Sequence, residues 1–543
     1  MKKSIKWLLI GAGIPAAILL TLMILGTVVR HKIEAELARM EVGDLYMRCE
    51  TVRVNLFRQS VRLGGVTLKT RERQVPPDSL LDVPVQFLDA TIDRVILRGI
   101  GLNGLKNKRY EFNTLLIDAP KGTVVTRQIP RDTLPMQSDE KTALASLNRL
   151  GVKEIEVTGG FIDWRQITEQ DTLRYLIYDL DAQVKGLLVD STRQSRERFL
   201  YSDHLQGSVG AFRYTFARGD YILALDSLEW NASDGRLFAV NAELMPQHPK
   251  NRFVQESPQH SDYTEARAQQ LTCSGVDFPA LWNEQTVRVD SIHVVSGHFL
   301  SYKNRQADYG REVKPMIHTQ IQRLGVPIDI RKIKLDDFNA AYEELAVHGT
   351  SPGRVTFDHI DATFYGYTNI VSRPDQYIEL YATSQLMNQG ELHAVVSMPV
   401  DPQNDRFEVK ATLLSTSLPA LNPMVTPLAR VELKAGQLSR MDFSMAGSGT
   451  TARADMVLRY SGLEVSVLKV RNGQWRERGG ISNLVNWAVI KSENPDAGGL
   501  RTASETIHRD PYRSTFNYLW KGISAGAMET AETGTAKRLL GGR

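Results

Sequence analysis

The chain has 543 residues, of which 66 are basic and 62 are acidic, so its formal net charge is only +4. Such a balanced charge does not favour a nucleic-acid-binding protein, for which a strongly basic domain is expected. The two cysteines, Cys49 and Cys273, are too few for a disulfide framework and form no C-x-x-C motif. They form either one extracytoplasmic disulfide or, as we favour, two buried small apolar side chains.

Residues 7–29 form an apolar run without a charged side chain. Roughly 20 apolar residues suffice to cross the ~30 Å hydrocarbon core of a membrane. The run is too long for a cleaved signal peptide, and no convincing cleavage site follows it. A buried core helix is the alternative, but nothing nearby in the sequence would cover a helix that is apolar on all sides. We therefore predict a signal anchor over residues 1–30, with the amino terminus in the cytoplasm and the body translocated.

Alternating apolar and polar residues dominate the chain after the anchor. Residues 32–40 are predicted to continue the anchor as a short helix, and alternation then begins over residues 52–56 and 61–68. A period of two with short polar turns indicates antiparallel hairpin strands with one apolar face. The pair Gly64-Gly65 interrupts the second run and predicts a bulge or a tight bend.

A short pattern then recurs along the chain. The sequence V-x-x-I-x-V over residues 152–157, followed by two glycines and Trp164, has similar copies over residues 289–302 and 330–342. Its first half is also found over residues 92–97. The spacing between copies is irregular, which excludes a solenoid of fixed period. We interpret the unit as a strand, a turn and a second strand that ends in an aromatic residue.

Other segments depart from this pattern. Residues 338–347 have helical propensity, but the recurring unit predicts a strand there. Residues 247–270 are polar and proline-containing, which indicates a loop or a mobile insertion. Helical spacing of apolar residues predicts helices over residues 141–150, 481–491 and 512–532.

The last of these predicted helices has an apolar stripe. Phe516, Leu519, Trp520 and Ile523 share one of its faces. Such a stripe is typical of a helix packed on the end of a sheet. The functional alternative is a tail that contacts a second membrane or a partner protein.

Motifs of known enzyme chemistry are absent from the sequence. It contains no G-x-S-x-G, no Walker A loop and no H-E-x-x-H. We interpret His293 and His298 as strand residues rather than metal ligands. The acidic pairs at 179/181 and 358/361 have the spacing of a solvent-facing strand side. We therefore expect no enzyme, and no catalytic, metal or cofactor site.

The order of these features resembles the AsmA-like family of bacterial envelope proteins. The resemblance rests on the anchor followed by VRVNLFRQSVRLGGVTL and on the units IEVTGGFIDW and IHVVSGHFLSY. It continues with IKLDDFNAAYEELAVHGTSPGRVTFDHIDATFYGYTN, and closes with MVLRYSGLEVSVL, SNLVNWAVIKSENP and RDPYRSTFNYLWKG. The resemblance implies an inner-membrane protein with a periplasmic body, whose long curved sheet carries phospholipid and supports outer-membrane lipid homeostasis. The family's motifs are structural, so no active site is implied.

We therefore predict a mainly β protein with one transmembrane helix, a long curved antiparallel β-sheet or groove, a few peripheral helices and carboxy-terminal helices. Alternation alone also fits stacked sandwich domains, because both arrangements need one apolar face. The resemblance favours the groove. The expected regions are the anchor (1–30), an amino-terminal β region (31–130), a central groove (131–426), a carboxy-terminal β region (427–480) and a helical tail (481–543).

The expected ligands are membrane lipids, with phospholipid favoured. The inner membrane is contacted through residues 7–29, and an outer-membrane or envelope protein is the expected partner of the tail. The alternative is an envelope scaffold or assembly factor that binds proteins through sheet edges and carboxy-terminal helices, without lipid transfer. The candidate groove-lining residues are Val54, Leu56, Val61, Leu63, Leu225, Val240, Ile378 and Leu380.

Overall fold

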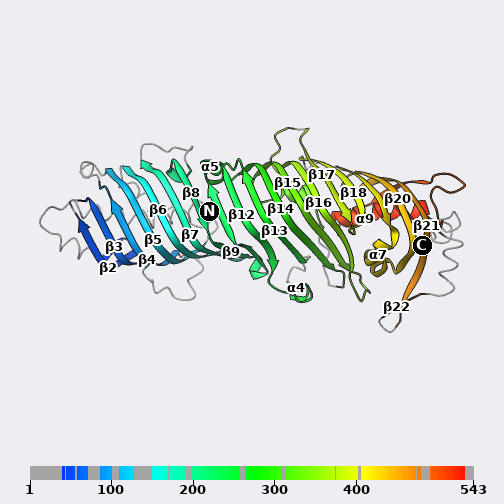
Figure 1. The fold of residues 1–543 in the computed structure, drawn as a ribbon, viewed down its shortest axis with the longest axis horizontal. Coiled ribbons are helices and arrows are strands. Elements are labelled where there is room, and N and C mark those ends of the chain that lie inside the picture. Colours follow the sequence, from blue (N-terminus) through cyan, green and yellow to red (C-terminus); the bar gives the residue numbers. More distant parts are fainter. Residues whose placement is uncertain are drawn as a thin grey trace. The chain divides into compact units, whose positions relative to one another are not determined.

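In the computed structural model of the chain, the described part is almost entirely β-structure. Within each part of the chain the strands lie side by side, nearly in sequence order (Figure 1). The structure describes residues 39–531 except 43–44, 56–57, 71–85, 101–108, 128–148, 169–170, 191–198, 257–262, 307–312, 374, 402–404, 472–473 and 478–489.

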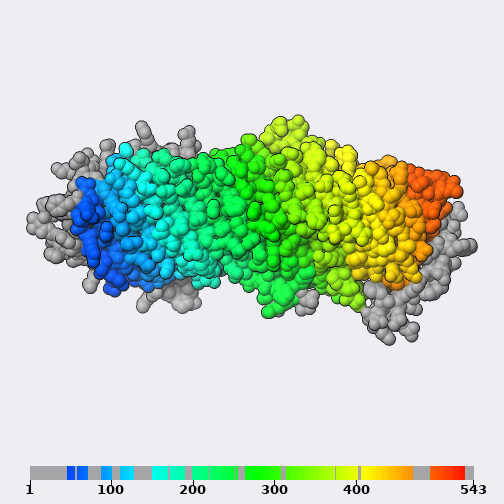
Figure 2. Space-filling view, in the orientation of Figure 1, coloured from blue at the N-terminus to red at the C-terminus, as the bar shows by residue number. Residues whose placement is uncertain are grey.

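The chain divides into two compact units. Unit 1 comprises Met1–Glu243 and Thr272–Gln285, and unit 2 comprises Leu244–Leu271 and Thr286–Arg543. In each unit the colour gradient of Figure 2 changes gradually along the surface, because strands that are neighbours in space are mostly neighbours in sequence. Most of the structure therefore forms through local pairings.

Unit 1 is built on a mixed, mostly antiparallel sheet. Strands β1 to β5 pair antiparallel in sequence order, β5 and β6 pair parallel, and β6 and β7 pair antiparallel. β7 pairs with β8 along one half and with β9 along the other. The elements are β1 (Arg39–Val42), β2 (Leu45–Asn55), β3 (Ser60–Thr70), β4 (Gln86–Arg98), β5 (Arg109–Arg127), β6 (Arg149–Ile167), β7 (Thr172–Asp190), η3 (Phe199–Tyr201), β8 (His204–Val209), β9 (Ala211–Phe216), η4 (Ala217–Gly219), β10 (Tyr221–Leu225), β11 (Ser227–Asn231), the first part of β12 (Arg236–Pro246) and α5 (Phe278–Asn283).

Unit 2 repeats this arrangement. β14 and β15 pair parallel, and β15 to β21 pair antiparallel in sequence order. β21 also pairs antiparallel with β22 and with β23. The elements are α4 (Lys250–Glu256), most of β13 (Tyr263–Ser274), β14 (Val287–Asn304), α6 (Ile317–Gln322), β15 (Ile328–Leu345), β16 (Gly353–Thr368), β17 (Tyr377–Leu386), β18 (Gly390–Pro399), β19 (Phe407–Ser417), η6 (Leu418–Leu421), α7 (Asn422–Ala429), β20 (Val431–Gly447), β21 (Thr451–Arg471), β22 (Gln474–Glu477), β23 (Thr502–His508) and α9 (Thr515–Ala531).

The mainly β class is confirmed, but a purely antiparallel sheet is wrong. Among the described residues, β5 pairs parallel with β6 in unit 1, and β14 pairs parallel with β15 in unit 2. Two parallel neighbours need a crossover connection, and α6 lies in the one between β14 and β15. Alternation within a strand does not depend on the direction of its neighbour, so the sequence pattern could not show this difference.

The recurring sequence unit marks a β-bulge, and the turn predicted inside it is wrong. β6 is one continuous strand of 19 residues. Val157 pairs with Ala182 of β7, and Gly160 pairs with Leu180. Because Leu180 and Ala182 lie on one side of β7, Val157 and Gly160 also lie on one side of β6, although they are three positions apart. The inserted residue, Gly159, has φ +61°, which glycine adopts without strain.

Equivalent bulges lie in neighbouring strands of both units. Two of them are capped by side chains: Asp181 accepts a hydrogen bond from the N–H of Gly159 (2.9 Å), and Asp361 accepts one from the N–H of Asp337 (3.1 Å). A bulge bends its strand and increases the local twist. The inserted or neighbouring positions with positive φ include Ala119, Gly159 and Asp179 in unit 1, and Ser296, Asp337 and His359 in unit 2.

Several predicted elements are tested by the structure. The strand over residues 338–347 is confirmed in β15, and the helix over 512–532 is confirmed in α9. The loop predicted over 247–270 is wrong, because α4 and β13 form there around the buried Phe253 and Tyr263.

Three predicted helices fall mainly outside the described residues. The helix predicted over 481–491 lies almost wholly outside them. The helices predicted over 32–40 and 141–150 are described only at their last residues. There the structure has the start of strand β1 at Arg39 and of strand β6 at Arg149. The predicted membrane span over 7–29 also lies outside the described residues. Among the residues that are described, no helix is both long enough and apolar enough to span a bilayer.

Candidate functional site

Each sheet has one face on which the apolar side chains collect, here called the apolar face. In unit 1 it is traced from strand to strand through the paired residues, including across the bulges. It includes Val61, Leu63 and Val66 of β3, Leu115 and Ile117 of β5, Ile155 and Val157 of β6, Ile177 and Leu180 of β7, Phe212 and Tyr214 of β9, and Leu223 and Leu225 of β10.

The apolar face of unit 1 changes from buried to half-buried along the sheet. Val61, Leu63 and Val66 of β3 are only 1–2% exposed and belong to one packed cluster of strands β2 to β6. The side chains of β7, β9 and β10 on the same face, such as Leu180 and Leu223, are half-buried. Large apolar side chains therefore remain in partial contact with solvent at this end of the face.

A row of aromatic rings crosses the half-buried part of this face. Trp164 stacks on Tyr175 (4.7 Å between ring centroids), and Tyr175 stacks on Tyr214 (4.5 Å). Phe216 and Tyr221 extend the row at 5.0 and 5.9 Å. Burial, and then the neighbouring Tyr214, raise the pKa of Tyr175, so this ring at the centre of the row keeps its proton at neutral pH.

The apolar face of unit 2 is traced in the same way. Leu335 pairs with Ala362 and Phe338 with Ile360, so the bulge at Asp337 again keeps the apolar residues on one side. Further along, the face includes Leu380 and Ala382 of β17, Ala394 and Val396 of β18, Val409 and Ala411 of β19, Phe443 and Met445 of β20, and Ala454 and Met456 of β21.

Helix α9 covers the last strands of this face. Tyr518, Gly522, Gly526 and Thr530 form its buried side and recur every four residues. A Cβ atom on Gly522 would lie 2.9 Å from Met445 Sδ and 3.4 Å from the Cβ of Ala454. The helix therefore lies directly against β20 and β21, where a larger side chain would hold it away.

The opposite face of each sheet is polar and rich in ion pairs. Arg94 pairs with Asp118 across β4 and β5 (2.5 Å) in unit 1. In unit 2, Arg440 donates two hydrogen bonds to the carboxylate of Asp442 (2.6 and 2.7 Å). The Arg440 guanidinium lowers the pKa of the Asp442 carboxyl. This polar face is stable in water, so the sheet presents two chemically different sides.

The predicted lining residues of unit 1 fall into different environments. Val54, Val61 and Leu63 lie in the packed cluster, and Leu225 lies on the half-buried part of the apolar face. Leu56 lies outside the described residues.

Val240 lies on the polar side, and its assignment to the groove is not supported by the strand register. It pairs with Ser227, whereas its neighbour Ala239 pairs with Leu228 on the apolar face. The row of bulges crosses β12 at Asn241, where φ is +49°. If apolar and polar positions are counted as strictly alternating through Asn241, Val240 is placed on the apolar side instead of the polar side.

The two predicted lining residues of unit 2 lie on its apolar face. Leu380 is half-buried and pairs with Phe364 and Val396. Ile378 is buried instead, because Ile321 of α6 and Val400 pack against it.

The predicted tail residues lie on α9. Leu519 and Ile523 pack against the sheet, and the ring of Phe516 lies 4.5 Å from that of Tyr342 on β15. Trp520 is half-buried. Most of this stripe therefore packs against the sheet, which is the first of the two alternatives given for it.

Metal-binding clusters and reactive cysteines are the other kinds of site to consider among the described residues. They contain no group of three or more His, Cys, Asp or Glu side chains placed to hold a metal ion. Cys49 and Cys273 are buried free thiols, as favoured from the sequence, and burial raises the pKa of each to about 11.

Two features of the apolar faces were not foreseen. The aromatic row could have been found, because Tyr175, Tyr214 and Tyr221 occupy alternating positions in strand-like segments. The concentration of methionines under α9 could not, because they come from several strands and one loop that only the fold brings together.

Comparison with known proteins adds no assignment. The chain matches no protein-family model, and no curated protein is similar to it in sequence.

Proposed function

We propose that the chain is an AsmA-like lipid carrier of the cell envelope. Residues 7–29 anchor it in the inner membrane, the body lies in the periplasm, and phospholipid acyl chains move along the apolar faces in support of outer-membrane lipid homeostasis. One observation carries the proposal: at the bulges of β6 and β15 the large apolar side chains stay on one side of the sheet, and that side is half-buried there.

The physical argument concerns exposed apolar area. Burial of apolar surface stabilises a protein by about 2.5 kcal/mol for each 100 Å² removed from water. Half-buried residues such as Leu180, Leu335 and Leu380 forgo part of this gain. An acyl chain lying across the strands would cover these side chains, and the flanking polar face would stay in water.

Two neighbouring residues of β17 provide a matched test. Leu380 points to the apolar face, and Tyr381 points to the opposite face, where it is 44% exposed. We expect Leu380→Glu to lower the phospholipid that co-purifies with the full-length protein, measured by mass spectrometry. Tyr381→Glu should leave it unchanged. Circular dichroism of both variants checks that the fold is retained.

The scaffold function has a specific observation in its favour. Tyr365, Tyr377, Tyr381 and Val395 are all exposed on unit 2, and the rings of Tyr365 and Tyr381 contact each other. Exposed tyrosines are common at protein interfaces. If Tyr381→Glu abolishes envelope function in cells while Leu380→Glu has no effect on function or lipid content, the carrier proposal fails and the scaffold is favoured.

A further inference from the structure

The apolar face of unit 2 continues without a break beneath α9. Val396 of β18 pairs with Val409, Val409 pairs with Met445, and Met445 pairs with Ala454 of β21. These residues are on the same side as Leu380, where the face is half-exposed. The covered and uncovered parts therefore form one surface, and α9 is what distinguishes them.

The covered part is rich in methionine. Five of the 14 methionines of the chain lie in this one cluster, which α9 closes. Methionine is unbranched and flexible, so a methionine-lined surface can repack around partners of different shape. The five residues are Met316, Met398, Met441, Met445 and Met456.

Helix α9 is held by its contacts rather than by its own propensity. Gly522 and Gly526 lie on its buried side, and each glycine costs about 1 kcal/mol relative to alanine within a helix. They allow close contact with Met445 and with Met456, whose Cβ would lie 2.9 Å from a Cβ on Gly526. If the helix loses these contacts, it also loses most of the packing that stabilises its helical conformation.

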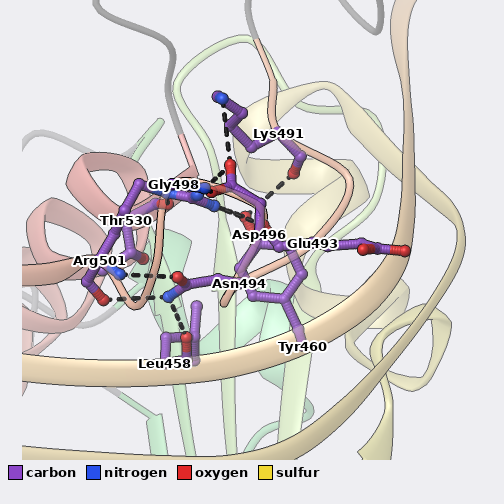
Figure 3. A network of polar contacts seen from close by, with 9 residues as sticks. All are labelled: Leu458, Tyr460, Lys491, Glu493, Asn494, Asp496, Gly498, Arg501 and Thr530. Carbon is purple, nitrogen blue, oxygen red and sulfur yellow. Dashed lines mark hydrogen bonds and ion pairs between the residues drawn. The ribbon is translucent and has the colours of Figure 1, made fainter.

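A polar network at the edge of the sheet fixes the carboxy-terminal end of α9 (Figure 3). Arg501 donates from Nε to the carbonyl oxygen of Thr530 (2.8 Å) and from Nη1 to Asp496 (2.6 Å). The backbone N–H of Lys491 donates to the carbonyl oxygen of Ala531 (2.8 Å). These bonds satisfy carbonyls that the last helical turn leaves free.

The loop that supplies the network is itself anchored to β21. Asn494 is fully buried, pairs through its backbone with Tyr460 and accepts a hydrogen bond from the N–H of Arg501 (2.8 Å). Arg501 and Asp496 remain about one-fifth exposed. The loop thus holds the helix end through the partly exposed Arg501 side chain and one backbone hydrogen bond from Lys491. Both bonds can open without unfolding the sheet.

We propose that the methionine-rich surface beneath α9 is a further lipid-binding site and that α9 is its removable cover. The ligand is an acyl chain of a phospholipid, which occupies the place of the helix after the Arg501 contacts open. This inference rests on the proposed lipid-carrier function. It adds that the lipid path extends to β21 only when α9 has moved.

A reversible disulfide tests the cover. Gly522→Cys combined with Ala454→Cys places two Cβ atoms about 3.4 Å apart, close to the separation in a disulfide. A Cβ at position 522 would lie 2.9 Å from Met445 Sδ, so this sulfur must shift in the variant. The wild-type protein, in which α9 is undisturbed, is therefore crosslinked alongside as the reference. The native thiols of Cys49 and Cys273 are buried, with pKa values of about 11, and should not compete.

The full-length variant is mixed with vesicles of phosphatidylethanolamine that carries a photoreactive acyl chain, and crosslinked peptides are identified by mass spectrometry. In the reduced protein we expect crosslinks at Leu380 and at Met445 or Met456. Oxidation should lower the methionine crosslinks about tenfold or more, because the competent state is removed, and reductant should restore them. The single variant Gly522→Cys, treated with oxidant, controls for oxidation itself.

The possible failures are distinguishable. Equal methionine crosslinks in the oxidised and reduced proteins would overturn the cover, and so would crosslinks at Leu380 without any at the methionines. The absence of crosslinks at every position in both states would instead contradict the proposed lipid-carrier function.

Discussion

The apolar faces of the two units are closed in different ways. In unit 1 the buried cluster consists mainly of aliphatic strand residues such as Val61, Leu63 and Val66, and Met47 is the one buried methionine described in it. In unit 2 the buried cluster combines methionine and alanine side chains of the sheet with one side of α9. Valine is stiff about χ1, whereas methionine has three flexible side-chain bonds.

This difference teaches that alternation creates an apolar face but does not determine its use. A face of stiff, branched residues packs in one arrangement and is suited to a permanent core. A face of methionines beneath a glycine-containing helix is suited to an exchange of partners. We therefore expect the cluster of unit 1 to be the rigid part and the α9 region of unit 2 to open first.

The largest expected effect comes from truncating the rigid cluster. Leu63 is 2% exposed, and Leu63→Ala should lower the free energy of unfolding of unit 1 by about 2–5 kcal/mol. Met445→Leu, at a site that is 0% exposed, should cost less than about 1.5 kcal/mol, because it nearly conserves volume. Chemical denaturation followed by hydrogen exchange in each unit measures both. Equal losses at the two sites would remove the proposed contrast.

A smaller and more local effect is expected at the polar network. Arg501→Gln removes charged hydrogen bonds to Thr530 and Asp496, so the amides of α9 should exchange about tenfold faster, which corresponds to about 1.4 kcal/mol. Arg440→Gln, at an exposed ion pair on the polar face, is the matched control and should leave α9 unchanged. Labelling of the thiols Cys49 and Cys273, which lie in unit 1, should stay slow in both variants. Fast thiol labelling in Arg501→Gln would mean that the units do not open independently.

The smallest expected effect depends on pH. The hydrogen bond from Lys491, assisted by the N–H of Gly498, lowers the pKa of Asp496 below its usual value. Because the folded pKa lies below the unfolded value near 3.9, this contribution to stability is complete above about pH 4 and is lost as the pH falls through the folded pKa. Fluorine NMR of fluorotryptophan at Trp520 should therefore show α9 loosening on acidification.

The acid effect has its own control. Asp496→Asn should abolish the pH dependence of the Trp520 signal. Asp442→Asn should not, although the pKa of Asp442 is also lowered, because this carboxylate pairs on the polar face of β20 with Arg440. A pH response that survives Asp496→Asn would assign the loosening to other groups.

Much of the fold could be predicted from local pattern. The strand over residues 338–347 was predicted correctly because its apolar positions repeat those of β6, despite a helical propensity. Helix α9 was predicted from the spacing of its apolar residues. The helix and strand within 247–270 were missed, because only a few apolar residues, such as Phe253 and Tyr263, fix them in a polar stretch.

The candidate site was predicted less well, for a geometric reason. Each bulge inserts a residue and exchanges the two sides of a strand for any count made along the sequence. Leu225 and Leu380 lie on the apolar faces, whereas Val240 lies on the polar side, because it pairs with Ser227. The residues that α9 covers could not be identified either, since they come from strands far apart in the chain.

The sequence by itself determined that the described chain forms strands with one apolar side, since a period of two fixes on which side of a strand each residue lies. It also determined that α9 is a helix, but not that Tyr518, Gly522, Gly526 and Thr530 form its buried side. Only the tertiary structure decided where the bulges return the apolar residues to one side, which strands pair parallel, and that α9 lies on Met445 and Met456. These features depend on contacts between distant segments, and no local period records such contacts.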